Sequence, residues 1–171
     1  MPRQRRGAGA VAVGALLALV VWSAPVSAGP GDFFPGPGGS SELSVRGAGK
    51  SHADGGDYGL GVWASTPGGP EEADGQFRFG HRGPDGEYGM AGNVHCLSRD
   101  ASGLIQVSGR IFGSGGQNFA GKDFAATIDV DSSPQRFSDV TLGEAGTVGA
   151  CSGGQPSFHG VTDGGYETEG R

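Results

Sequence analysis

Short stretches in which apolar and polar residues alternate recur along the chain from residue 43 onward, separated by runs of turn-forming residues. The clearest stretch is 76–81, where Phe77 and Phe79 share one face and Arg78 takes the other. Successive side chains of a strand point to opposite faces of a sheet, so this alternation predicts strands with one buried face.

Residues 92–112 are the centre of this pattern. Two apolar runs flank the polar turn 98–103, which predicts a β-hairpin. Interruptions at Gly89 and Gly92 in the first arm predict a β-bulge. Pro84, inside Gly-Pro-Asp-Gly, predicts a β-turn joining that arm to the strand before it.

No window after residue 28 shows the apolar spacing of an amphipathic helix, so we expect very little helix. The pattern predicts an all-β fold: an antiparallel β-sandwich or small barrel of about seven or eight strands, without choosing between these closures. Residues 47–57, 67–75 and 113–122 are turn-rich or loop-like. The expected strands are 43–46, 58–66, 76–81, 88–97, 104–112, 124–130 (half-buried), 140–142 (weak) and 157–161.

The chain begins with a basic segment, an apolar run over 8–22 and small residues up to Ala28. This is the pattern of a Sec-type signal peptide spanning 1–28 with cleavage after Ala28, so we expect a secreted, extracellular protein without stable membrane insertion. Residues 29–41, rich in Gly and Pro, predict a disordered linker. A single β domain is expected over 42–165 and a frayed C-terminus over 166–171.

The acidic balance of the chain limits its partners. Removing 1–28 takes three of the 12 basic residues and none of the 18 acidic ones, which leaves a net charge of −9. That charge argues against nucleic acid and anionic membranes as partners. The chain is also glycine-rich, with 37 glycines, many of them placed where turns are expected.

Cys96 and Cys151 are the only cysteines. In an exported chain such a pair predicts an intramolecular disulfide. Closing a loop of about 55 residues would stabilise the fold by roughly 4 kcal/mol in the chain-entropy model.

The four histidines, His52, His81, His95 and His159, are the residues best suited to chemistry. None of them shows the H-x-H or H-x3-H spacing of a metal site, and strict alternation would place His95 and Cys96 on opposite faces. We therefore expect no metal and no cofactor.

No local motif predicts catalysis. The G-x-S-x-G signature of serine hydrolases is absent. Acidic residues that could serve a glycosidase or bind calcium gather in expected turns, where solvation explains them, and none matches a twelve-residue calcium loop. They are Asp54, Asp57, Glu71, Glu72, Asp85, Glu87, Asp129 and Asp131. The sequence predicts that the protein is not an enzyme.

Four large aromatic residues, Tyr58, Trp63, Tyr88 and Tyr166, allow two interpretations. They could form a flat platform for sugars. The interpretation that we favour is that Trp63 and Tyr88 simply fill a core that has few large side chains.

The segments 75–79, 92–97, 107–111 and 124–131 resemble a group of small exported actinobacterial proteins, and the likeness extends over residues 75–162. The resemblance implies an all-β fold with Cys96 paired to Cys151 and implies no activity. Members often carry Asp-Asn-Gly where this chain has Asp131-Ser132-Ser133-Pro134, so that turn departs from the group.

The sequence thus predicts a secreted, monomeric, non-enzymatic β domain acting as a binding or envelope-associated module, with cell wall or polysaccharide as a possible partner. The alternative is a small extracellular hydrolase or protease inhibitor with a site assembled from loops.

Overall fold

Ten strands form one continuous antiparallel sheet in the computed structural model, which describes residues 43–148, 151, 153–154 and 157–170. These residues all belong to one compact unit, Pro37–Arg171. The strand order is β10-β1-β2-β3-β4-β5-β6-β7-β9, with β8 beside β6. The bounds are β1 Leu43–Ala53, β2 Gly56–Thr66, β3 Asp74–Gly83, β4 Gly86–Arg99, β5 Ile105–Gly115, β6 Asp123–Asp129, β7 Arg136–Ser138, β8 Thr141–Gly143, β9 Phe158–Gly160 and β10 Asp163–Gly170.

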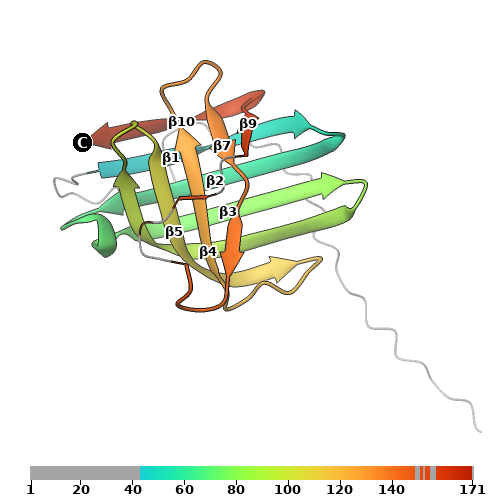
Figure 1. Cartoon of the computed structure of the whole chain (residues 1–171), viewed down its shortest axis with the longest axis horizontal. Coiled ribbons are helices and arrows are strands. Elements are labelled where there is room, and N and C mark those ends of the chain that lie inside the picture. Colours follow the sequence, from blue (N-terminus) through green and yellow to red (C-terminus); the bar gives the residue numbers. More distant parts are fainter. Residues whose placement is uncertain (1–42, 149–150, 152, 155–156, 171) are drawn as a thin grey trace, which may run out of the picture. The chain divides into compact units, whose positions relative to one another are not determined.

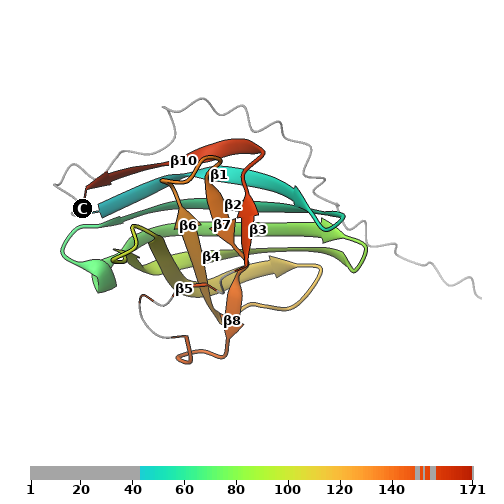
Figure 2. The same ribbon diagram turned by 45° about the horizontal axis from the view of Figure 1, so that its top comes forward.

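The sheet is curled into a half-barrel, which confirms the predicted all-β antiparallel class. Strands β1 to β4 run side by side, while β5, β6 and β7 cross them steeply on the other side of the core (Figures 1 and 2). The described residues contain one short 3-10 helix, Pro70–Glu72, and no α-helix.

The sheet turns its corner within β4 and β5, which bend and contribute to both layers (Figure 1). Their pairing shifts register between Ala91 and Gly92 and again between Val94 and Cys96. Such shifts bend a strand and increase its twist. The bulge predicted beside Gly92 is therefore confirmed, and it has a role, because it folds one sheet over itself.

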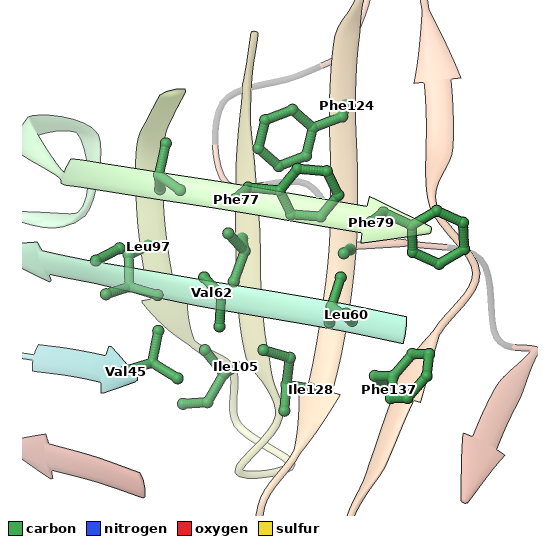
Figure 3. Packing of buried hydrophobic residues seen from close by; sticks show 14 of the residues in the cluster. Val45, Leu60, Val62, Phe77, Phe79, Leu97, Ile105, Phe124, Ile128 and Phe137 are labelled. Carbon is green, nitrogen blue, oxygen red and sulfur yellow. The ribbon is translucent and has the colours of Figure 1, made fainter. Parts of the chain in front are cut away.

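The core lies between the two layers and is built from the inward faces that alternation predicted (Figure 3). Phe77 and Phe79 are buried and Arg78 is exposed. Phe77 of the first layer stacks on Phe124 of the second, with ring centroids 4.0 Å apart. Among the described residues, the largest fully buried apolar side chains are Phe77, Phe124, Phe137, Leu60, Leu97, Ile105, Ile111 and Ile128.

The predicted hairpin is present, with β4 and β5 joined through residues 100–104. Oδ1 of Asp100 accepts hydrogen bonds from the amides of Ser102 and Leu104, and Oδ2 accepts one from Gln106. Burial alone would raise the pKa of Asp100, but these hydrogen bonds outweigh it and lower the pKa. The carboxylate thus fixes the turn.

Several expectations differ from the structure. Residues 47–53 continue β1 instead of turning, since Gly47 admits the backbone of β10 at close range. Residues 113–115 extend β5. The weakly patterned β7 went unpredicted, because three residues are too few for a period to show.

The C-terminal segment expected to fray from Tyr166 is instead most of β10, which pairs with β1 over eight residues. Tyr166 is buried, and its hydroxyl donates to the carbonyl oxygen of Leu60 at 2.8 Å. One buried aromatic anchor and a full ladder of backbone hydrogen bonds explain the correction.

Strand β6 was expected to be half-buried, but all seven of its residues are buried. Its outer face is covered by the segment that follows β8. The amide of Gly154 in that segment donates to Oγ1 of Thr127 at 2.9 Å. From β7, Oγ of Ser138 accepts a hydrogen bond from the Thr127 amide at 2.9 Å. The strand therefore lies between the core and a covering segment.

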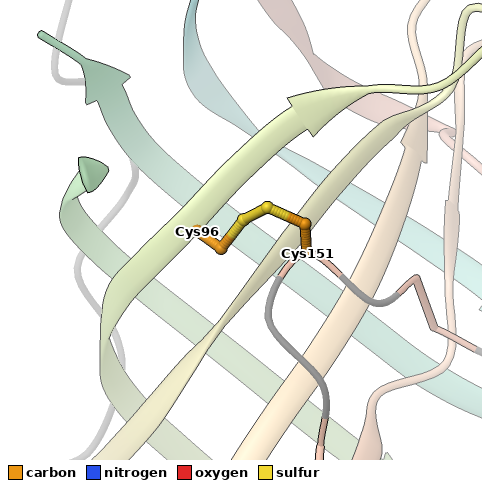
Figure 4. The surroundings of a disulfide bond; sticks show 2 residues. All are labelled: Cys96 and Cys151. Atoms are coloured by element: carbon orange, nitrogen blue, oxygen red, sulfur yellow. A yellow bond between two sulfur atoms is a disulfide. The ribbon is translucent and has the colours of Figure 1, made fainter. Parts of the chain in front are cut away.

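The predicted disulfide joins Cys96 of β4 to Cys151, 55 residues away, with a Cα–Cα distance of 5.1 Å (Figure 4). It fixes the covering segment against the outside of the sheet. Strict alternation along the strand was the basis for expecting His95 and Cys96 on opposite faces. The bulge between Val94 and Cys96 interrupts that alternation. His95 is exposed, whereas Cys96 is buried.

Gln135, just before β7, closes the half-barrel. Its side-chain Oε1 accepts from the Tyr166 amide at 2.8 Å, and its Nε2 donates to the Tyr166 carbonyl at 3.0 Å. Its backbone carbonyl accepts from the amide of Val161 at 2.8 Å. One glutamine thus gives β10 the donor and acceptor that a neighbouring strand would supply.

The predicted signal peptide 1–28, the cleavage after Ala28 and the linker 29–41 lie outside the described residues. Within the described part of the chain, no helix has the length and hydropathy to cross a membrane.

Replacing Cys96 by serine should lower the free energy of unfolding by about 2–5 kcal/mol, because it opens the loop and releases the segment over β6. Thermal and urea unfolding measure this loss. The double variant C96S/C151S should match the single variant, and an unchanged melting temperature would contradict the structural role of the disulfide.

Gly109→Ala should destabilise the fold by roughly 1–3 kcal/mol, because a Cβ there overlaps the backbone carbonyl oxygen of Asn93 across the bend. Gly113→Ala, on the same strand, is the matched control, since a Cβ at Gly113 meets no atom within 4 Å. Urea unfolding should find the control within about 0.5 kcal/mol of the parent. Equal losses in both variants would rule out a special role for the corner.

Candidate functional site

At one end of the half-barrel, the inward faces of β2, β3 and β4 carry two tyrosines and an imidazole. Tyr58 lies directly opposite His81, and His81 lies opposite Tyr88. The ring centroids are 4.6 Å and 5.1 Å apart, with planes tilted by 43° and 45°. Because each ring is tilted against the next, this aromatic row forms a curved wall.

The opposite wall comes from the β5–β6 loop and from residues 139–142, which follow β7 and enter β8. Phe119 of that loop meets Tyr88 edge to face, at 5.6 Å and 69°. His159 of β9 stacks on Tyr58 at 4.1 Å and 19°. Asp139, directly after β7, accepts a hydrogen bond from Nε2 of His159 at 2.7 Å. Since an ionised carboxylate only accepts, this bond places a proton on Nε2.

Between the two walls lies a hollow of about 480 Å³, within the size range of small-molecule sites. We call it the aromatic pocket. Its lining residues are Tyr58, Phe79, His81, Tyr88, Met90, Gln117, Phe119, Asp139, Val140 and Leu142.

The electrostatics of the aromatic pocket are one-sided. Burial raises the pKa of both Tyr58 and Tyr88, and the negative charge of Asp139 raises both further. Asp54 and Asp85, in the turns at this end of the sheet, add to the effect on Tyr58. Both phenols are therefore neutral at physiological pH. Among the described residues that line the pocket, none is a lysine or arginine.

Nδ1 of His81 is buried and makes no hydrogen bond within the described part of the chain. An unpaired buried polar atom costs roughly 1–3 kcal/mol. The wall of the aromatic pocket therefore holds a polar group that the fold itself does not satisfy.

The chemistry available to this site is limited. The described lining residues include no serine, threonine or cysteine, and the phenols of Tyr58 and Tyr88 are neutral. His159 is only 6% exposed in its side chain and lies between the rings of Tyr58 and Phe137. An imidazole enclosed in this way is poorly placed to reach a substrate proton.

The structure separates the four histidines of the sequence. His81 lines the aromatic pocket and His159 stacks on Tyr58 of its wall, whereas His52 pairs with Asp57 at 2.8 Å on the surface and His95 is exposed elsewhere on the sheet. Within the described residues, no three His, Cys, Asp or Glu side chains gather as a metal site would need.

The acidic residues considered for catalysis or calcium are also dispersed. Asp129 pairs with Arg136, Asp131 with Arg99, and Glu87 with Arg82. Glu71 and Glu72 belong to the 3-10 helix beside a second hollow of about 500 Å³, next to Cys151. That hollow has no converging aromatic or imidazole groups among its described residues.

The four aromatic residues weighed as a sugar platform divide between both interpretations. Tyr58 and Tyr88 line the pocket, Tyr166 is a core residue, and Trp63 is half-buried on the outer face of β2. The four side chains therefore do not form one flat surface.

The sequence alone did not single out Asp139, Gln117 or Phe119 as site residues. They come from loops and from the end of a three-residue strand, where no periodicity marks an inward position. The inward position of His81 could have been predicted, because His81 continues the alternation of Phe77 and Phe79 on the same face of the strand.

Comparison with protein-family models, with curated proteins and with solved structures finds no significant match. The resemblance to small exported actinobacterial proteins therefore stays a prediction.

Proposed function

We propose that this protein is an exported, non-enzymatic binding domain that holds a small ligand in the aromatic pocket. The observation that carries the proposal is the convergence of three aromatic side chains and a carboxylate from separate strands and loops around one hollow: Tyr58, Tyr88, Phe119 and Asp139. Concave sites lined by aromatic side chains with a few placed polar groups are typical of small-molecule binding.

Two further features support binding. The buried Nδ1 of His81 has no hydrogen-bond partner in the described part of the chain, which lowers the stability of the fold. Unsatisfied buried groups of this kind are often found at functional sites. The site also stands on strand ends rather than on loops alone, since Tyr58, His81 and Tyr88 are fixed by their cross-strand ladders. A rigid wall of this kind loses little entropy when a ligand binds.

The alternative class, a small hydrolase, draws its support from the hydrogen bond between His159 and Asp139. Such a pair could orient an imidazole as general base. Against it stand the enclosure of the His159 ring and the lack of a hydroxyl or thiol nucleophile among the described lining residues. A water-activating mechanism would need His159 to reach the hollow, which Tyr58 covers.

The test is a ligand-observed NMR screen of the purified full chain with neutral sugars, cell-wall fragments, aromatic acids and small organic cations. We expect at least one class to bind, and Phe119→Ala to weaken that binding about tenfold through loss of a ring wall.

Phe112→Ala is the matched control, because Phe112 is 58% exposed and is not among the lining residues. It should leave binding unchanged. If no class binds, or if binding survives in both phenylalanine variants, the proposed site is wrong. Turnover of any bound probe that is lost in His159→Gln would favour the hydrolase instead.

A further inference from the structure

The aromatic pocket combines ring faces with a single carboxylate and the imidazole of His81, and its described lining residues include no lysine or arginine. Aromatic faces carry negative quadrupole potential, and a cation over such a face is attracted to it. The rings of Tyr58 and Tyr88 are tilted against His81 by 43° and 45°, and Phe119 meets Tyr88 at 69°, so the aromatic side chains curve around the hollow instead of forming a flat stack.

Asp139 supplies the full negative charge. Its side chain is 44% exposed, and in the described part of the chain His159 donates the only hydrogen bond to its carboxylate. A ligand with neither a hydrogen-bond donor nor a positive charge would strip water from this carboxylate without replacing the lost interaction. A ligand with a positive charge would compensate for that loss.

The charges around the aromatic pocket are also negative. The charges of Asp54, Asp85 and Asp139 all act on Tyr58 strongly enough to raise its pKa, after the larger effect of burial. Near this end, Arg82 pairs with Glu87, and His52 pairs with Asp57. The field at the mouth of the pocket therefore favours the approach of cations.

We infer that the aromatic pocket takes a small organic cation, a substituted ammonium group whose charge faces Asp139 and whose alkyl groups contact the rings of Tyr58, Tyr88 and Phe119. This inference rests on the proposed function and gives its ligand a chemical class. Inorganic cations are a poorer match, because they prefer several oxygen ligands to ring faces.

The test compares choline with its neutral carbon isostere, 3,3-dimethylbutan-1-ol, by NMR titration of the purified full chain. The two probes share shape and differ in charge. We expect choline to bind at least about tenfold more tightly than the isostere. We also expect shifts to be confined to signals of the pocket residues.

Asp139→Asn is the decisive variant, since the amide oxygen can still accept from His159 while the charge is removed. It should weaken choline about tenfold and leave the isostere unchanged. Asp74→Asn is the matched control, because Asp74 is exposed on β3 at the end opposite His81, and it should change neither probe.

The outcomes separate the two proposals. Equal binding of choline and the isostere would overturn the cationic class and leave the binding function standing. The cationic class would also be overturned, and the binding function kept, if neither choline nor the isostere binds while a neutral probe from the ligand screen binds and Phe119→Ala weakens that binding. Equal loss of choline in D139N and D74N would assign the effect to net charge and also overturn the inference.

Discussion

The structure depends on how the free edge of a curled sheet is closed. An unpaired edge strand exposes donors and acceptors that must be satisfied or protected. Here the side chain of Gln135 bonds both backbone groups of Tyr166, and β9 continues into β10 within a few residues. Strands β10 and β9, which stand at the two ends of the strand order, are thereby held together. The core therefore needs no second, separate sheet.

Closure also produces the site. The row of Tyr58, His81 and Tyr88 is the continuation of the core stripe on β2, β3 and β4, with aromatic and polar groups where the barrel opens. His159 and Asp139 reach this row only because β7 and β9 are folded back against β2. The disulfide acts elsewhere, by holding the covering segment on the outside of β6.

Much of the fold could be predicted from the sequence, since alternation marks a buried face directly. Phe77, Phe79, Ile105 and Val107 all lie as their parity indicates. Closure could not be predicted, because it depends on a single polar side chain in a turn, and Gln135 has no sequence signature. Gly47 and Gly92 were ambiguous for a different reason. In a sequence, a glycine that permits close packing cannot be told from a glycine that ends a strand.

The candidate site was predictable only in part. The sequence singled out four of the residues at the site: Tyr58, His81, Tyr88 and His159. His159, however, is far from the other three in the chain. Convergence of that kind depends on topology rather than spacing. Asp139 gave no signal at all, because it is one acidic residue among 18 and follows a strand of only three residues.

The central claim is that closure of the half-barrel places β9 against β2. The most direct measurement is the nuclear Overhauser effect between the ring protons of Tyr58 and His159, whose centroids are 4.1 Å apart. Strong cross-peaks in the disulfide-bonded protein are the predicted result. Their absence, with the β1–β4 ladder intact by amide exchange, would show that the barrel is open at this seam and that the aromatic pocket is not formed.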